Sequence, residues 1–295
     1  MKSLHTLLAG AIDYAGLFPP AKLDMENAVH HYAAYRGGQY AWALGRFIVP
    51  AAQLHEFEQA FMQVSEEGGD EWGVSLLVGS DVTEHLEAIA EFNQRSGHGQ
   101  VATARIDAVE IKASAAEEMT GFTAPRPLQV YVEVPLDPDP GPVLDAIAAA
   151  GVRAKVRTGG VTPGAFPDDR HLARFVIACA ERKLAFKATA GLHHALRAQY
   201  RLTYEPDSPS GMMYGFLNML VAAAVARDGG DGGDVVAALN DPSALNIRFD
   251  DTGFTWSRYH NDLATIAALR KTFFTAFGSC SFTEPIEDLK SLELL

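Results

Sequence analysis

The sequence predicts one α/β domain, a single (β/α)8 TIM barrel that spans residues 1–295. Three observations predict this fold. Short β-branched runs alternate along the chain with amphipathic helical patterns, which is typical of a parallel sheet. The chain length suits one large barrel. Polar residues also gather where two of the runs enter glycine turns, and barrel enzymes place their chemistry at the carboxyl ends of strands.

Seven apolar or β-branched runs predict the first seven strands, at residues 9–18, 41–50, 72–80, 107–114, 128–135, 153–160 and 185–194. Amphipathic patterns between them, several opened by Asp or Pro, predict helices at 24–36, 51–66, 81–95, 115–119, 139–150 and 168–182. The eighth strand must come from the last hundred residues of the chain. The preferred candidate is LNIRFDDTGFTW at 245–256, and AFGSC at 276–280 competes with it.

The connection after the seventh strand is enlarged in this interpretation. It holds a helical and loop insertion at about 195–245, which includes the glycine-rich stretch RDGGDGGD at 227–234. The alternative fold is an open doubly wound sheet. Nothing like its GxGxxG phosphate turn follows the first predicted strand, so the closed barrel is favoured.

Composition limits the partners that we expect. The 37 acidic side chains outnumber the 24 basic ones, giving a formal charge of −13 that repels nucleic acid and anionic membranes. A small-molecule substrate is therefore the expected partner, with no cofactor. The bulky segment at 212–225 suits either an inner helix or a subunit interface, which leaves a homo-oligomer possible.

The same features predict a cytoplasmic protein. Cys179 and Cys280 lie far apart without a CxxC spacing, which favours neither a disulfide framework nor a zinc site. The apolar stretch in MKSLHTLLAG is too short for a secretory signal and is soon followed by Asp13. The longest later apolar run, at 215–226, is too short to span a bilayer.

Charged and polar side chains share the inward face of four neighbouring predicted strands. Because side chains alternate along a strand, these are Glu110 with Lys112, then Glu133, then Lys155 with Arg157, then Lys187 with Thr189. Neighbouring strands lie about 5 Å apart, so the groups can meet in one pocket. A plain ion pair is the structural alternative for each residue. Burying an ammonium group costs several kcal/mol, however, and a chain that needed only stability could use Leu there. A second cation and partial desolvation both favour a neutral amine, which attacks carbonyl groups.

These residues carry a resemblance. KVRTGG at 155–160, followed by KATAGLHH at 187–194, resembles the deoxyribose-phosphate aldolase family, which has a Schiff-base lysine in a K-T-S-T-G motif and a second lysine in a K-x-x-G-G motif. AIDYAGLFPPAKLDMENAV is similar to the family's opening I-D-H-T-x-L-x-P strand. DAVEIKA and YVEVP are similar to its fourth and fifth strands. The resemblance covers about the first 195 residues as short motifs.

The resemblance implies that Lys155 forms an imine, that Lys187 favours the neutral form of Lys155, and that Glu110 is the acid–base group. Arg157 stands where the family has a small residue, and a guanidinium there could hold a carboxylate. The predicted function is a class I aldolase-like lyase acting on a small carbonyl substrate, carboxylated rather than phosphorylated. Further residues expected to bind the substrate are Thr158, Gly159, Gly160, Lys112, Glu133, Thr189, Gly191, His193 and Asp13.

Two other functions stay open. A divalent metal ion held by His193, His194 and nearby glutamates could stabilise an enolate, although adjacent histidines point to opposite sides of an extended chain. A barrel that binds a small molecule without catalysis is the second alternative. A ligand-sized pocket around Lys155 would favour an enzyme over the non-catalytic barrel.

Overall fold

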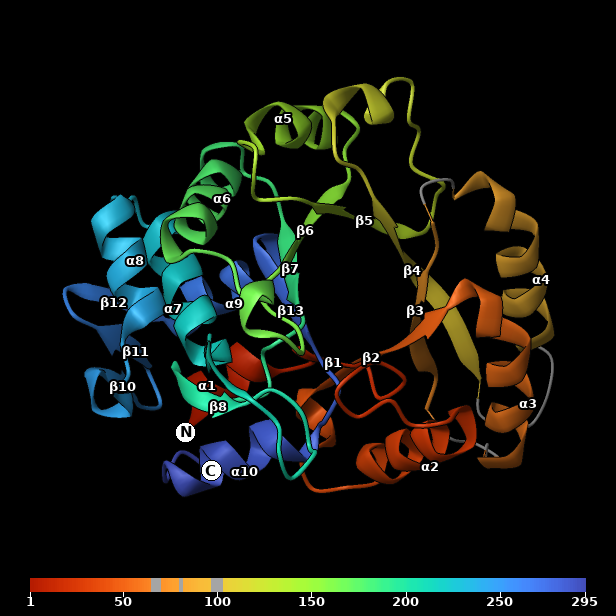
Figure 1. Cartoon of the computed structure of the whole chain (residues 1–295), viewed down its shortest axis with the longest axis horizontal. Helices are drawn as coiled ribbons and strands as arrows, with labels where there is room; N and C mark the ends of the chain where they lie inside the picture. Colours follow the sequence, from red (N-terminus) through yellow and green to blue (C-terminus); the bar gives the residue numbers. More distant parts are fainter. Residues whose placement is uncertain (65–69, 80–81, 97–102) are drawn as a thin grey trace.

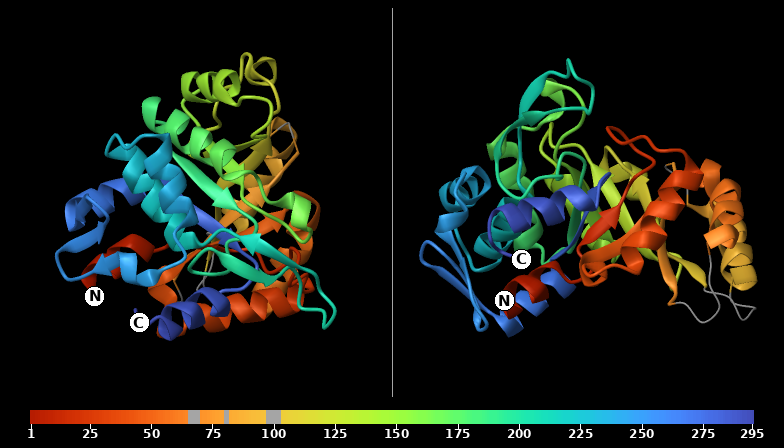
Figure 2. Two further views of the ribbon diagram at one scale, coloured as in Figure 1. Left: turned by 60° about the vertical axis from the view of Figure 1, so that its left-hand side comes forward. Right: turned by 90° about the horizontal axis from the view of Figure 1, so that it is seen from below.

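The computed structural model describes residues 1–64, 70–79, 82–96 and 103–295. Eight parallel strands close into a barrel in the order β1-β13-β7-β6-β5-β4-β3-β2, with helices around the outside (Figure 1). The predicted TIM barrel is confirmed. Both ends of the chain lie on the same side of the molecule, near α10 (Figures 1 and 2).

The barrel strands are β1 (Ile12–Tyr14), β2 (Leu44–Pro50), β3 (Trp72–Leu77), β4 (Ala104–Lys112), β5 (Gln129–Val134), β6 (Arg153–Arg157), β7 (Phe186–Thr189) and β13 (Phe274–Ser279). Six of the seven predicted runs contain one of the first seven strands, and the fourth run, at 107–114, overlaps β4, which begins three residues earlier. The observed strands are mostly shorter than the runs, because the polar and glycine-containing ends of the runs belong to the connecting loops. Residue 80, at the end of the third predicted strand, lies outside the described residues.

The helices are α1 (Lys2–Leu8), α2 (Met25–Arg36), α3 (Leu54–Val64), α4 (Leu86–Ser96), α5 (Gly141–Ala149), α6 (Asp169–Glu181), α7 (Phe216–Arg227), α8 (Gly232–Asn240), α9 (Leu263–Thr272) and α10 (Thr283–Ser291). Short 3-10 turns are η1 (Ala41–Ala43), η2 (Ala51–Gln53), η3 (Thr83–His85), η4 (Ala116–Met119), η5 (Pro163–Ala165) and η6 (Ala244–Asn246). The helix predicted at 115–119 is the turn η4. The ends of two other predicted helices, at 65–66 and 81, lie outside the described residues.

Aspartate caps explain where several helices begin. The side chain of Asp24 accepts a hydrogen bond from the backbone N–H of Asn27 at the start of α2, at 2.8 Å. Asp168 caps α6 and Asp262 caps α9 in the same manner. A carboxylate at this position satisfies an otherwise unpaired N–H group and complements the helix dipole.

The preferred candidate for the eighth strand is wrong. Residues 245–256 contain two strands, β10 (Ile247–Phe249) and β11 (Gly253–Trp256), which form an antiparallel sheet with β12 (Tyr259–Asp262) outside the barrel. Asp250 closes the turn between β10 and β11, because its Oδ1 accepts hydrogen bonds from the backbone N–H groups of Thr252 and Gly253. The competitor at 276–280 overlaps β13, which pairs with β1 and β7 and completes the barrel.

The insertion after β7 is longer than predicted. It begins with a hairpin of β8 (Ala198–Arg201) and β9 (Ser210–Met213), continues through α7 and α8, and ends with the β10–β12 sheet (Figure 2). Helix α7 is buried from Phe216 to Ala226 and packs against α6, α8 and α9. The segment at 212–225 therefore forms mostly an inner helix of the insertion.

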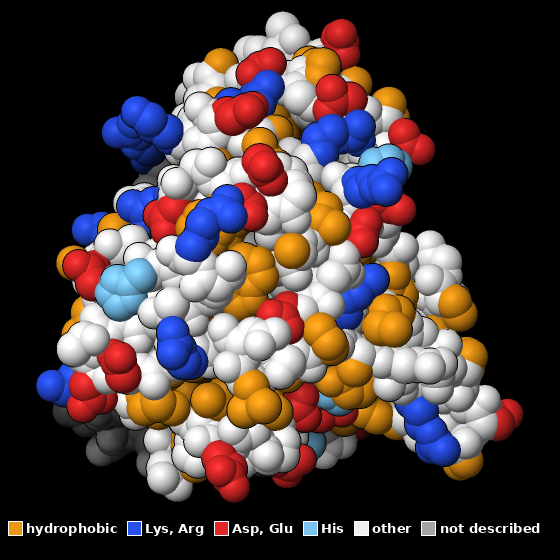
Figure 3. All heavy atoms as spheres, turned by 90° about the vertical axis from the view of Figure 1, so that its left-hand side faces the viewer, with side chains coloured by type: hydrophobic (Ala, Val, Ile, Leu, Met, Phe, Trp, Pro, Cys, Tyr) orange, Lys and Arg blue, Asp and Glu red, His pale blue; other side chains and the backbone are white. Residues whose placement is uncertain are grey.

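The outer face of the molecule on the side of this insertion carries interspersed acidic and basic side chains (Figure 3). Within the described residues, none of the helices combines the length and apolar character needed to cross a bilayer.

Candidate active site

Strand register brings the predicted lysines together. Lys155 on β6 is the register partner of Lys187 on β7, and Glu133 on β5 is the partner of Lys155. Ala154 and Val156, the residues on either side of Lys155 along β6, lie on the opposite face of the strand and are fully buried. Because side chains alternate, burial of this apolar face directs the charged positions into the barrel.

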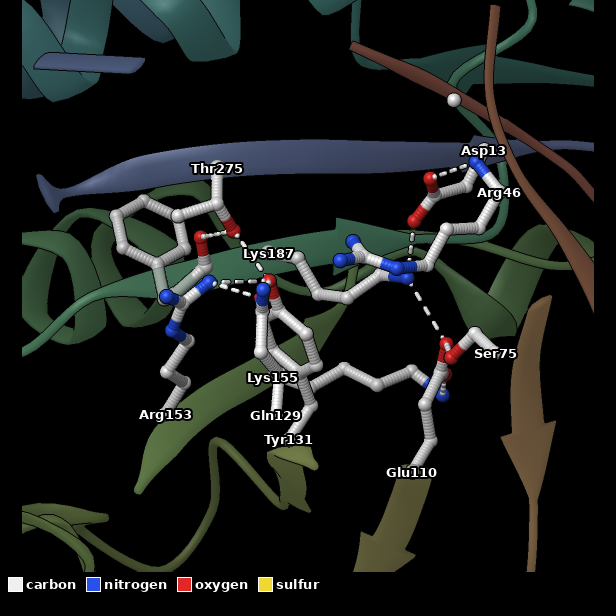
Figure 4. Close-up of polar contacts among 12 residues, drawn as sticks. Asp13, Arg46, Ser75, Glu110, Gln129, Tyr131, Arg153, Lys155, Lys187 and Thr275 are labelled. Atoms are coloured by element: carbon white, nitrogen blue, oxygen red, sulfur yellow. Dashed lines mark hydrogen bonds and ion pairs between the residues drawn. The ribbon is translucent and has the colours of Figure 1, made fainter. Parts of the chain in front are cut away.

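The charged groups form one connected network of ion pairs. The Lys155 Nζ lies 2.7 Å from Glu110 Oε2 and 2.7 Å from Glu133 Oε2. The Lys187 Nζ donates to Glu110 Oε1 at 2.9 Å and also contacts Asp13 Oδ2. Glu110 thus bridges the two ammonium groups, as Figure 4 illustrates. Lys155 is 3% exposed and Lys187 is 1% exposed, so water screens these charges weakly.

Opposite charges outweigh the effect of burial in this network. Burial alone would raise the pKa of Glu110, but the two lysines hold that pKa well below its usual range. Burial would likewise lower the pKa of Lys187, but Asp13 and Glu110 raise it. The pKa of Glu133 is also lowered, because Lys155 and Arg157 more than offset its burial. Lys187 is therefore a permanent cation beside Lys155.

Sequence reasoning missed two residues that support the network. The hydroxyl of Ser75 on β3 donates to Glu110 Oε1 at 2.8 Å, and the backbone N–H of Arg46 donates to Asp13 Oδ1 at 2.8 Å. Ser75 is a polar residue in the otherwise apolar run WGVSLL, and that was the available signal. Gly45 is also required, because a Cβ there would lie 2.4 Å from Asp13 Oδ1.

A second polar group occupies the barrel interior near the lysines. Tyr131 donates to or accepts from Thr275 Oγ1 at 2.9 Å, and the guanidinium of Arg153 donates to Gln129 Oε1 at 2.6 Å. The Lys187 Nζ lies 5.2 Å from the centroid of the Tyr131 ring, a favourable cation–π distance. Figure 4 shows this group beside the lysine network.

A cavity of about 270 Å³ opens above the lysines. Its polar wall comprises Glu110, Lys155, Arg157, Lys187, Thr189 and His193. Its apolar wall includes Phe18, Pro19 and Pro20, from the turn after β1, together with Ile48 and Leu77. The predicted residues Gly160 and Gly191 also line it. Asp13 and Glu133, which were also predicted to bind the substrate, do not line this cavity; Asp13 contacts Lys187 and Glu133 contacts Lys155.

Arg157 and Lys112 lie farther out than Lys155. The side chain of Arg157 is half exposed and its Nε lies 3.4 Å from Glu133 Oε1. Lys112 does not line the cavity. It is exposed at the end of β4 and borders a second hollow, which it shares with Glu133 and Arg157. Arg157 therefore stands between the cavity and this outer hollow.

Thr158 and Gly159 do not line the cavity either, contrary to prediction. The buried hydroxyl of Thr158 donates to the carbonyl oxygen of Ala190 at 2.6 Å, which joins the loops after β6 and β7. A Cβ on Gly159 would lie 2.4 Å from the ring of Phe166, so glycine permits close packing at this point. Both residues shape the loops without presenting a polar group to the cavity.

The adjacent histidines diverge. His193 forms part of the cavity wall, and its Nδ1 lies 3.1 Å from Ser279 Oγ. His194 stacks on Tyr200, with ring centroids 3.5 Å apart, and its Nδ1 lies 3.1 Å from Asp288 Oδ2. Across the described part of the chain, no three His, Cys, Asp or Glu side chains are arranged to hold a metal ion.

Comparisons with protein-family models, with curated proteins and with solved structures found no match to this chain. The resemblance to the deoxyribose-phosphate aldolases therefore rests on the sequence motifs.

Proposed function

We propose that this chain is a Schiff-base lyase of the class I aldolase type, a distant relative of the deoxyribose-phosphate aldolases, acting on a small carboxylated carbonyl compound. One observation carries the proposal. Two buried lysines from adjacent strands face one ligand-sized cavity, with carboxylates within hydrogen-bonding distance of both. Burying these charged groups is costly, which favours a catalytic use for them over a purely structural one.

The reaction begins with loss of a proton from Lys155. Glu133, 2.7 Å from its Nζ, is an ionised carboxylate that can accept this proton. The neutral amine then adds to the substrate carbonyl, Glu133 returns its proton to the departing hydroxyl, and loss of water leaves a protonated imine.

The protonated imine is an electron sink. When the carbon–carbon bond beside it breaks, the electron pair moves to the imine nitrogen and forms an enamine. Glu110 stays ionised and lies 2.7 Å from the Lys155 nitrogen, so it stabilises the positive charge of the imine. A water molecule beside the imine exchanges protons at the adjacent carbon.

Arg157 supports a carboxylated substrate. Its guanidinium lines the cavity at the outer edge, where one carboxylate, Glu133, already approaches it. A planar guanidinium suits a carboxylate in a two-point hydrogen bond. A 2-oxo acid could then place its carbonyl carbon toward Lys155 while its carboxylate faces Arg157.

Borohydride trapping tests the proposal. Purified protein is incubated with pyruvate and sodium borohydride, and the modified peptide is identified by mass spectrometry. We expect a reduced pyruvate adduct on Lys155. Lys155→Arg keeps a cation for Glu110 and Glu133 but cannot form the imine, so it should carry no adduct at that position. Adducts confined to exposed lysines such as Lys271 would refute the Schiff-base function and favour a non-catalytic barrel.

A further inference from the structure

A second reactive group lines the same cavity, on the loops that follow β7 and β13. It consists of His193, Ser279 and Cys280, with Glu284 of α10 nearby. We infer that His193 is the catalytic base that removes the hydroxyl proton from a β-hydroxy carbonyl substrate held as an imine on Lys155. The inference rests on the proposed function and assigns a step that the lysine network is poorly placed to perform.

Hydrogen bonding fixes the tautomer of His193. The Ser279 hydroxyl donates its only proton to the carbonyl oxygen of Ser281 at 2.6 Å. Ser279 Oγ can therefore only accept from His193 Nδ1, 3.1 Å away, so Nδ1 carries the ring proton. Glu284 Oε2, 3.7 Å from Nδ1, lies on the same side and also favours a proton there. The lone pair is consequently on Nε2.

Nε2 is available to a ligand. Its single hydrogen-bond contact among the described residues is Cys280 Sγ at 4.0 Å, which is too long for a strong hydrogen bond. His193 is 6% exposed and lines the cavity. Burial lowers its pKa to about 4, with a smaller contribution from His194, so the ring is neutral at pH 7. Burial also raises the pKa of Cys280 to about 11, which leaves its thiol protonated and unable to compete as the base.

Glu110, the base implied by the motif resemblance, is fully engaged. Its Oε1 accepts hydrogen bonds from Ser75 and Lys187, and its Oε2 pairs with Lys155. Taking a proton from the substrate would require it to give up part of this network. His193 Nε2 has no such engagement within the described residues, because its one hydrogen-bond contact is the long one to Cys280.

The step is balanced as follows. His193 Nε2 takes the proton from the hydroxyl on the carbon β to the imine, and the hydroxyl oxygen forms a carbonyl. The bond between the α and β carbons breaks, its electron pair reduces the imine to an enamine on Lys155, and the aldehyde fragment leaves. His193 is then an imidazolium. It returns its proton to solvent, water protonates the enamine carbon, and hydrolysis of the resulting imine releases the second carbonyl product from Lys155.

The test separates this step from imine formation. The probes are 4-hydroxy-2-oxopentanoate, which should be cleaved to pyruvate and acetaldehyde, and pyruvate itself in deuterated water. For His193→Gln we expect borohydride trapping of pyruvate on Lys155 and deuterium exchange at its methyl group to persist. Cleavage should fall by about 10²- to 10⁴-fold, the usual contribution of general base catalysis. His194→Gln is the matched control and should cleave at the normal rate.

Chemical rescue distinguishes a base from a structural residue. His193→Ala should regain cleavage as free imidazole is added, whereas a merely packed histidine would show no such response. Normal cleavage by His193→Gln, or loss of trapping together with cleavage, overturns the inference and leaves the proposed function standing. Wild-type protein that traps pyruvate but neither cleaves nor forms the hydroxy acid overturns it too, because no hydroxyl proton is then removed. Failure of trapping in the wild type refutes the proposed function itself.

Discussion

The buried ion-pair network predicts that Lys187→Met is strongly destabilising. The Lys187 side chain is 2% exposed and neutralises Asp13, which is 1% exposed, together with one oxygen of Glu110. Glu110 would keep Lys155 and Ser75 as partners after the substitution. Asp13 would keep the backbone N–H of Arg46 and the more distant charges of Arg46 and Arg270, so the substitution leaves one buried carboxylate without a directly paired cation.

Removing one partner of a buried ion pair costs about 3–5 kcal/mol. We expect Lys187→Met to lose free energy of unfolding in this range, which is roughly a hundredfold or more in the folding equilibrium constant. Adding Asp13→Asn should restore part of the loss, because an amide carries no charge and can still accept the Arg46 hydrogen bond. Lys271→Met, at an exposed position on α9, should cost less than about 1 kcal/mol.

Urea unfolding at pH 7 measures these differences, followed by tryptophan fluorescence and by circular dichroism so that coincident transitions establish two-state behaviour. A Lys187→Met variant that is as stable as Lys271→Met would refute the reasoning, since the buried charge would then cost nothing. Failure of Asp13→Asn to restore stability would show that the cost comes from lost packing rather than from an unpaired carboxylate.

Three further predictions concern stability. Burial lowers the pKa of His193 to about 4, so below pH 6.5 the unfolded chain binds a proton that the folded chain does not. The free energy of unfolding from urea titrations should therefore fall by about 3 kcal/mol at most as the pH is lowered from 6.5 to 4. His193→Gln should make this pH dependence weaker. Gly215→Ala would put a Cβ 2.3 Å from a backbone oxygen and should cost more than about 2 kcal/mol in thermal or urea unfolding, whereas Gly164→Ala, with open space, should change stability by less than about 0.5 kcal/mol. Asn218→Ala removes three hydrogen bonds of 2.8 Å between its buried side chain and backbone groups and should cost about 2–4 kcal/mol by the same measurement.

The sequence pattern was sufficient to predict the barrel fold and the proximity of the two lysines. The alternation of side chains placed Lys155 and Lys187 on inward faces of successive strands, and parallel pairing then required them to be neighbours. The pattern could not predict that Asp13 neutralises Lys187. Asp13 comes from β1, which does not pair with β6 or β7, and only the closure of the barrel brings it to Lys187.

The error at the eighth strand had a further consequence. The run at 245–256 has the stronger strand composition, but its internal DDTG sequence forms a turn and makes it a hairpin. Because residues 276–280 were not the preferred candidate for the eighth strand, the sequence did not place Ser279 and Cys280 beside the loop after β7. The sequence therefore indicated His193 as a binding residue but gave no sign of the hydroxyl that fixes its tautomer.

The carboxylates of the network balance the positive charges on which the proposed chemistry depends. Asp13, Glu110 and Glu133 balance two lysines and the more exposed Arg157, so the cluster holds three charges of each sign. A neutral amine at Lys155 disturbs this balance, but transfer of its proton to Glu133 keeps the total unchanged. Formation of the protonated imine then restores a cation opposite Glu110 at the original position. The carboxylate that pairs with the Lys155 ammonium group is thus also placed to stabilise the protonated imine.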